Sequence, residues 1–65
     1  MYKIYKTVNK IDELILEELS WELACFKAED LDAESELSKE GAIYTIQTPS
    51  DEMFIYDGCW EKLDI

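Results

Sequence analysis

The chain has 65 residues and a formal net charge of −10, which results from 16 acidic residues against six lysines, with no arginine and no histidine. A chain this short can build one hydrophobic core, so we expect a single domain over residues 1–65. A hydrophobic content of 48% and an aromatic content of 12% argue against a disordered tail. The negative field repels DNA, RNA and anionic lipid and attracts basic proteins, which excludes direct nucleic-acid binding.

The N-terminal segment lacks the apolar run of about 7 to 15 residues that a secretory signal requires. No part of the chain has the roughly 18 consecutive apolar residues of a transmembrane helix. We therefore expect a cytoplasmic protein that does not enter the membrane. Cys25 and Cys59 have no metal-type spacing, and in a reducing compartment they are expected to be small buried hydrophobic residues rather than a disulfide.

The first 28 residues are predicted to form a strand followed by a helix. Residues 1–8 alternate between apolar and polar side chains, which indicates a half-buried strand. Asn9 is a good N-cap, and residues 10–28 contain neither glycine nor proline, so we expect the main helix there. Its expected core face consists of Ile11, Ile15, Leu19, Leu23 and Phe26. Its expected solvent face consists of Glu13, Glu17, Ser20, Ala24 and Lys27. A second strip beside the core face consists of Leu14, Glu18, Trp21 and Cys25.

Residues 28–41 allow two interpretations. One is a short second helix over residues 31–40, and the other is a continuation of the first helix with a break near Asp30. In both, Gly41 follows the helix as a residue suited to the left-handed conformation that ends helices. Leu31 and Leu37 are expected to reach the core while the acidic residues between them stay in water.

The last third of the chain is predicted to be an antiparallel meander. Residues 42–48, 53–56 and 59–63 are the expected strands, separated by a turn around Pro49 and by Asp57-Gly58, a strong hairpin signal. The predicted fold class is α+β: a small single domain, β-α-(α)-β-β-β, with one main helix packed on the sheet.

The residue types present argue against catalysis and metal binding. There is no histidine, the serines have no nearby base in the sequence, and neither cysteine has a neighbour that would activate it, so we expect no enzyme activity and no cofactor. The segment that begins at Asp30 starts like an EF-hand loop. Ser35 stands where that loop needs glycine and Gly41 where it needs a bidentate glutamate, so no metal site is expected.

The acidic residues are concentrated in residues 12–40, which contain eleven acids and two lysines. This can be a surface that only confers solubility, or one that binds a partner. The second interpretation is favoured because like charges on a small fold cost stability. Carboxylates on successive helical turns, about 5 to 6 Å apart, could occupy a groove built for a nucleic-acid backbone. Trp21 is the candidate aromatic anchor of the interface. The predicted partner-binding residues are Glu13, Glu17, Trp21, Asp32, Glu34, Glu36, Glu40, Asp51 and Glu52.

Two functions compete on these observations. In size, charge and use of lysine without arginine the chain resembles inhibitors of host defence from phages and mobile elements, such as anti-CRISPR, anti-restriction and DNA-glycosylase-inhibitor proteins. That resemblance implies an inhibitor that covers the basic nucleic-acid-binding surface of an enzyme, with DNA mimicry as one way of doing so. The alternative is another interaction module: an antitoxin or immunity-type protein that neutralises a basic toxin, or an adaptor that forms a homodimer through the strip of Leu14, Trp21 and Cys25.

Overall fold

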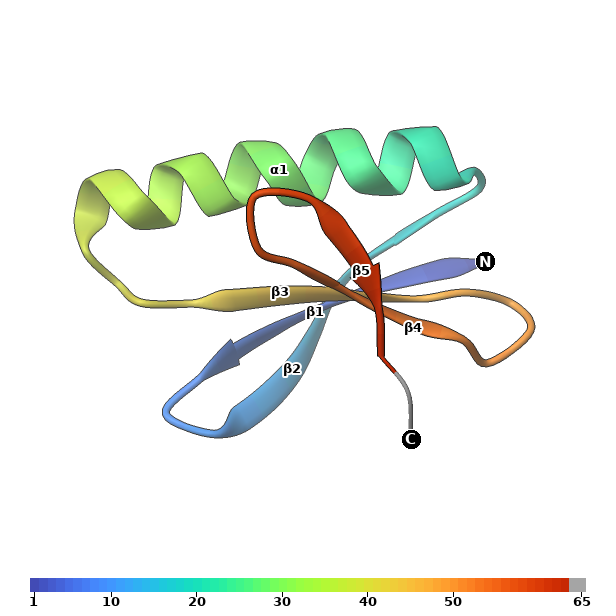
Figure 1. Cartoon of the computed structure of the whole chain (residues 1–65), viewed down its shortest axis with the longest axis horizontal. Coiled ribbons are helices and arrows are strands. Elements are labelled where there is room, and N and C mark those ends of the chain that lie inside the picture. The colour runs from blue at the N-terminus through green and yellow to red at the C-terminus, as the bar shows by residue number, and fades with distance from the viewer. Residues whose placement is uncertain (64–65) are drawn as a thin grey trace.

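The computed structural model describes residues 1–63 and shows one helix lying along one face of a five-stranded antiparallel sheet (Figure 1). The elements are β1 (Tyr2–Val8), β2 (Ile11–Glu18), α1 (Trp21–Ser38), β3 (Ile43–Gln47), β4 (Met53–Tyr56) and β5 (Trp60–Lys62). The strand order in the sheet is β2-β1-β3-β4-β5. The α+β class, the main helix packed on the sheet and the C-terminal antiparallel meander are confirmed. The element order is β-β-α-β-β-β, which corrects the predicted order.

The largest correction concerns residues 10–20, which were predicted to be helical. Residues 11–18 form β2, an edge strand paired antiparallel with β1. Asn9 and Lys10 both have positive φ, 53° and 66°, and make the two-residue turn between the strands, so Asn9 is a turn residue and not a helix cap. Because Ile4 pairs with Leu16 and Tyr5 with Leu14, Ile15 is an extra residue that shifts the register. That bulge disturbs the simple alternation by which a strand is recognised.

α1 is one continuous helix of 18 residues that passes through Asp30 without a break. It begins after Ser20, whose side chain accepts a hydrogen bond from the backbone N–H of Leu23 at 3.2 Å. Lys39 ends it in the left-handed conformation, with φ of 58°. The left-handed cap was expected at Gly41, and the helix ends two residues before the predicted end at Glu40. Gly41 also has a positive φ, +73°, in the turn that leads into β3.

The face of α1 that packs on the sheet carries small residues. Ala24, Ala28 and Ser35 are buried there, and they meet the buried sheet residues Ile4, Tyr44 and Ile46. The Ser35 hydroxyl accepts the backbone N–H of Ala42 at 3.3 Å, so this buried polar side chain has a partner. Of the expected core residues, Ile15 and Leu31 are partly buried against this core, and the others are exposed because residues 11–18 form β2 and α1 begins only at Trp21. Largely exposed are Ile11, Leu19, Leu23, Phe26 and Leu37, whereas Ala24, predicted to face solvent, is buried.

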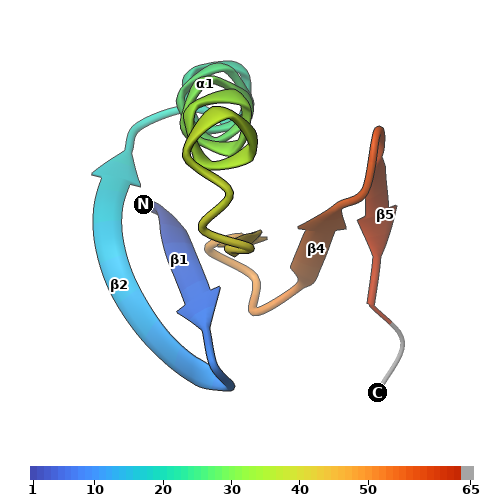
Figure 2. The ribbon, with the colours of Figure 1, turned by 90° about the vertical axis from the view of Figure 1, so that its left-hand side faces the viewer.

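The sheet curls around α1, with β2 on one side and the β4–β5 hairpin on the other (Figure 2). The predicted hairpin turn is confirmed: Gly58 has φ of +77°, and the backbone N–H of Asp57 donates to the carbonyl of Cys59 at 3.0 Å. Because α1 packs on β1, β2 and β3, the hairpin stands beside the helix and is joined to it through aromatic side chains.

Candidate partner-binding surface

The solvent face of α1 carries an exposed row of mostly apolar side chains, here called the outer stripe. Phe26 is 71% exposed and Leu37 is 87% exposed. The row follows helical spacings of three and four, which place its members on one side of the helix. The outer stripe consists of Leu23, Phe26, Asp30, Ala33 and Leu37. Single exposed apolar residues are ordinary, but a row at helical spacing is a surface suited to a partner.

A row of carboxylates, here called the acidic flank, runs beside the outer stripe on the side of the β4–β5 hairpin. It consists of Glu22, Glu29, Asp32 and Glu36. The indole Nε1–H of Trp60 donates to Glu29 at 3.5 Å, which fixes the direction in which this flank faces. The pKa of Tyr56 is raised, first by desolvation and then by the charges of Glu29, Asp32 and Glu36. Within residues 1–63, none of the four carboxylates is in an ion pair.

A second group of acids surrounds Lys6 near the C-terminal end of α1. The Nζ of Lys6 lies 2.6 Å from the Oε1 of Glu40. The pKa of Lys6 is raised, mainly by the hydrogen bond to Glu40 and also by Glu13. Glu34 lines a cavity of about 300 Å³ with Lys6, Glu40 and Tyr44. Burial raises the pKa of Tyr44, Lys6 lowers it, and the charges of Glu40, Asp32 and Glu34 raise it further. The lysine partly neutralises this group, so it is a weaker electrostatic surface than the acidic flank.

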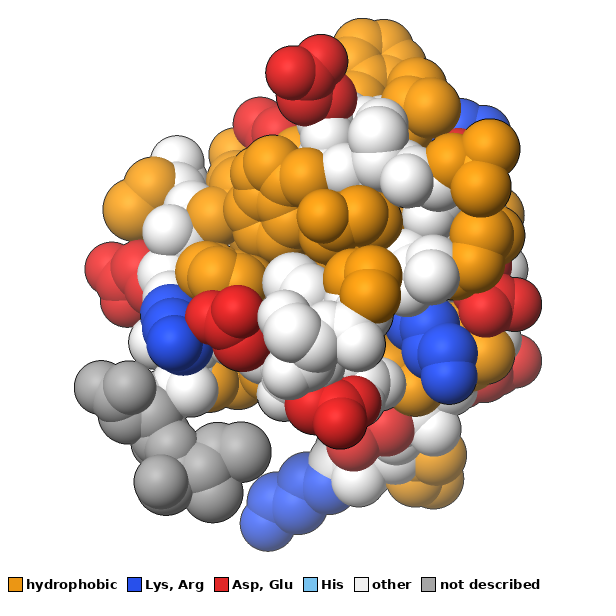
Figure 3. Space-filling model, turned by 90° about the vertical axis from the view of Figure 1, so that its right-hand side faces the viewer, with side chains coloured by type: hydrophobic (Ala, Val, Ile, Leu, Met, Phe, Trp, Pro, Cys, Tyr) orange, Lys and Arg blue, Asp and Glu red, His pale blue; other side chains and the backbone are white. Residues whose placement is uncertain are grey.

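Aromatic residues cluster at the N-terminal end of α1. The Trp21 ring lies edge-on to Phe54, with centroids 4.9 Å apart, and 6.1 Å from the Tyr2 ring. Trp60 lies 5.8 Å from Trp21 and 5.0 Å from Tyr56, which extends the cluster to the hairpin. Figure 3 shows hydrophobic side chains gathered on this end of the molecule, with acidic side chains around them. The cluster borders a cavity of about 500 Å³.

The structure divides the nine predicted partner-binding residues among several places, so they do not form one row. Glu13, Glu34 and Glu40 lie around Lys6, Asp32 and Glu36 belong to the acidic flank, and Trp21 and Glu52 line the aromatic cavity. Glu17 stands apart on the edge strand β2, and Asp51 accepts a hydrogen bond from the Gln47 amide in the β3–β4 turn. The proposed dimer strip of Leu14, Trp21 and Cys25 does not exist, because Leu14 lies in β2.

The sequence reasoning missed the residues that complete these groups. Glu22 and Glu29 share a side of α1 with Glu36 because all three are seven residues apart, a spacing visible in the sequence. They were missed because the helix was predicted to start at residue 10, eleven residues before its observed start at Trp21. Tyr2 and Phe54 join Trp21 only through tertiary packing, for which the sequence holds no local signal.

Comparisons with known proteins identify no relative: no family, no curated protein and no solved structure matches this chain. Over residues 1–63, no helix combines the length and the apolar character needed to cross a membrane. In the same part of the chain, no three histidine, cysteine or acidic side chains are grouped so that they could hold a metal ion. The outer stripe with its acidic flank is the most extended of the surfaces described above.

Proposed function

We propose that this protein is a small acidic inhibitor that docks α1 onto the basic nucleic-acid-binding surface of a partner enzyme and blocks it. The observation that carries the proposal is the acidic flank, a row of carboxylates without ion-pair partners among residues 1–63, beside the exposed outer stripe. The carboxylates attract a basic partner and set the orientation, and the apolar side chains supply contact area once water is excluded.

A nucleic-acid-binding surface fits the acidic flank because of how its charges are spaced. From Glu29 through Asp32 to Glu36 there is about one carboxylate per helical turn, so the charges follow one another at about 5 to 6 Å. Lysines and arginines that bind a phosphate backbone meet a comparable row of single negative charges. The net charge of −10 adds long-range attraction, which accelerates the encounter at low salt.

A second copy of the chain is a poor occupant for this surface. In an antiparallel pairing of two outer stripes, Glu29 of one copy would approach Glu29 of the other, and like charges at such positions are destabilising. Asp30 lies in the middle of the outer stripe and would be buried without a partner, which is costly. A basic partner relieves both problems, because it can pair with Asp30 and with the flank.

The test compares two double charge reversals of equal size. Glu29→Lys/Glu36→Lys reverses the acidic flank, and Glu17→Lys/Glu61→Lys places the same change on exposed strand residues that are not part of it. The tagged natural protein and both variants are incubated with nuclease-treated lysate and eluted in steps of salt. We expect the natural protein and the strand variant to capture a nucleic-acid-binding enzyme that the flank variant does not retain.

Two results would contradict the proposal. Equal capture by both variants would mean that total charge, and not its placement on α1, decides binding. Capture of a partner whose nucleic-acid binding is unaffected by the natural protein would remove the inhibitory role.

A further inference from the structure

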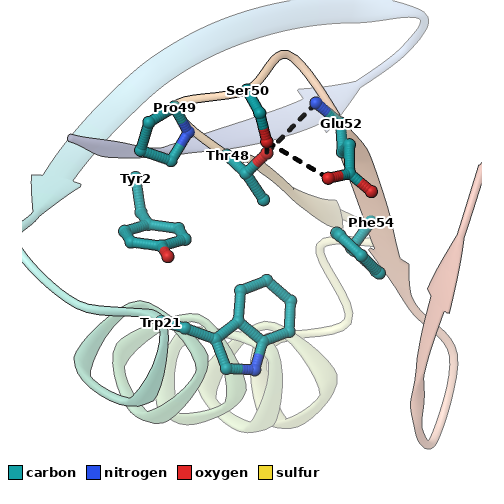
Figure 4. A pocket seen from close by; sticks show the side chains of 7 residues that line it. All are labelled: Tyr2, Trp21, Thr48, Pro49, Ser50, Glu52 and Phe54. Carbon is teal, nitrogen blue, oxygen red and sulfur yellow. Dashed lines mark hydrogen bonds between the residues drawn. The ribbon is translucent and has the colours of Figure 1, made fainter.

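The aromatic cavity lies at the opposite end of α1 from the Lys6 group, and no step of the proposed docking through α1 uses it. Its lining comes from four parts of the chain: the start of β1, the first turn of α1, the β3–β4 turn and β4 (Figure 4). The lining residues are Tyr2, Trp21, Thr48, Pro49, Ser50, Glu52 and Phe54. At about 500 Å³ the cavity has room for the end of a long side chain together with part of its stem.

Three aromatic rings border this cavity, and none stacks flat on another. The plane of Trp21 is inclined by 59° to that of Tyr2 and by 63° to that of Phe54. Figure 4 shows the three rings arranged around the open space, with the indole N–H of Trp21 directed away from the β3–β4 turn. The faces of aromatic rings carry negative electrostatic potential, so a cation that enters this space can lie against a ring face that is open to it.

The polar side of the cavity carries one carboxylate and two hydroxyls that can accept hydrogen bonds from a cation. Among the seven lining residues, Glu52 is the single charged group, and Thr48 and Ser50 contribute hydroxyls. Its carboxylate accepts a hydrogen bond from Ser50 at 3.1 Å and lies 2.9 Å from the Nζ of Lys62. These contacts lower the pKa of Glu52, which keeps the carboxylate ionised at neutral pH. A cation would share the Glu52 carboxylate with Lys62, and the net charge of −10 is what disfavours an anion at this site.

We propose that the aromatic cavity binds a basic side chain of the partner, a guanidinium or alkylammonium that lies against the rings of Tyr2, Trp21 and Phe54 near the Glu52 carboxylate. The identification of the source as a partner side chain rests on the proposed inhibitory function. Arginine is the better occupant because its planar guanidinium stacks on aromatic faces and is weakly hydrated. Such an anchor would fix the end of α1 on the partner while the acidic flank follows the basic surface.

The test uses the isolated protein, so its failure is distinguishable from failure of the inhibitory function. Nα-acetyl-arginine amide is titrated into isotopically labelled protein, and the indole N–H signal of Trp21 and the ring signals of Tyr2 and Phe54 are followed by NMR. Nα-acetyl-citrulline amide, which has nearly the same shape without the charge, is the control ligand. We expect saturable shifts at these three residues with the arginine compound and at least about fivefold weaker binding of the citrulline compound.

Two variants locate the site. Phe54→Leu keeps an apolar side chain but removes a ring, and should weaken binding of the arginine compound at least about threefold. Tyr56→Leu removes the next aromatic ring on β4, which contacts Trp60 and does not line the cavity, and should leave binding unchanged. If Phe54→Leu loses the dispersed amide spectrum of the folded protein, Tyr2→Leu at the start of β1 tests the same point.

Three results would overturn the assignment. Equal binding of the arginine and citrulline compounds would show an apolar cleft without preference for charge. Absence of saturable shifts at Trp21 would show that the cavity binds no such side chain. Choline binding at least about tenfold tighter than the arginine compound would point to a free quaternary ammonium ligand and not to a partner side chain.

Discussion

The two faces of α1 differ in a way that reverses the usual amphipathic helix. The face on the sheet has the small residues Ala24, Ala28 and Ser35, whereas the face toward solvent has Leu23, Phe26 and Leu37. Small inner residues let the helix lie close to the sheet, where its backbone and the side chains of Ile4 and Ile46 fill the core. Of the large apolar residues of α1, Trp21 and Leu31 are partly buried against this core, whereas Leu23, Phe26 and Leu37 are exposed. The comparison shows that large apolar side chains of α1 lie outside its buried face, and the proposed docking depends on this exposed row.

The largest expected loss of stability comes from placing a larger side chain on the inner face of α1. Ala28 is fully buried, so Ala28→Leu must displace α1 or strain its neighbours, and we expect the free energy of unfolding to fall by about 1 to 3 kcal/mol. The matched change on the outer face is Leu37→Ala, for which we expect a change within about 0.5 kcal/mol. Urea unfolding followed by circular dichroism measures both. An equal loss of unfolding free energy in the two variants would contradict the difference in burial between the two faces of α1.

The two cysteines sharpen the comparison, because Cys25 lies at the border between the inner face and the acidic flank while Cys59 is exposed in the β4–β5 turn. Desolvation, with a smaller contribution from Glu29, raises the pKa of the Cys25 thiol from 9.0 to about 11. At pH 8 its thiolate is therefore about a hundredfold scarcer than that of an unshifted thiol. We expect iodoacetamide to modify Cys59 at least about tenfold faster, as measured by peptide mass spectrometry. Modification of the two cysteines at equal rates would contradict the partial burial of Cys25.

The end of α1 offers a smaller test. Lys39 is left-handed, with φ of 58°, a conformation that costs a residue with a side chain more than it costs glycine. Lys39→Gly should therefore raise the free energy of unfolding by about 0.5 to 1 kcal/mol. The control is Lys10→Gly, which acts on the other positive-φ lysine, in the β1–β2 turn. A destabilised Lys39→Gly protein would show that the helix does not end in the way described.

The smallest expected effect concerns pH. Hydrogen bonds from Lys62 and Ser50 lower the pKa of Glu52 in the folded protein. A carboxyl group with a lower pKa in the folded state stabilises it above the unfolded pKa of about 4.3, and this contribution disappears as the pH falls through the folded pKa. We expect the stability difference between the natural protein and Glu52→Gln to shrink steadily below about pH 4.3. Thermal unfolding of both proteins from pH 7 to pH 3 measures this stability difference. A difference that stays constant over this range would contradict the interactions of Glu52 with Lys62 and Ser50.

Local signals made the C-terminal third of the fold predictable from sequence. Asp57-Gly58 and the turn around Pro49 separate short alternating segments, and each of these signals acts over a few neighbouring residues. The segment from Asn9 to Ser20 was not predictable in the same way. Asn9 suits a helix cap as well as a turn, and the spacing of Ile11, Ile15 and Leu19 suits a helix. Pairing with β1 decided the outcome, and that pairing is a tertiary interaction.

The candidate surface was predictable in composition but not in arrangement. The excess of acids was evident from the sequence, and three of them, Glu18, Glu40 and Glu52, form ion pairs with lysines that are distant in sequence or on other elements. Which carboxylates remain for a partner therefore depends on the fold. The aromatic cavity also depends on the fold, because its rings come from three separate elements, β1, α1 and β4.

The most direct test of the account is a competition experiment with the captured enzyme. Fluorescence anisotropy of a labelled duplex bound to that enzyme is followed while the natural protein, Glu29→Lys/Glu36→Lys or Glu17→Lys/Glu61→Lys is added, at several salt concentrations. We predict that the natural protein and the strand variant displace the duplex with an affinity that falls as salt increases, and that the flank variant is at least about tenfold weaker with a flatter salt dependence. Displacement by the flank variant as effective as that by the natural protein would contradict the claim that α1 presents the binding surface.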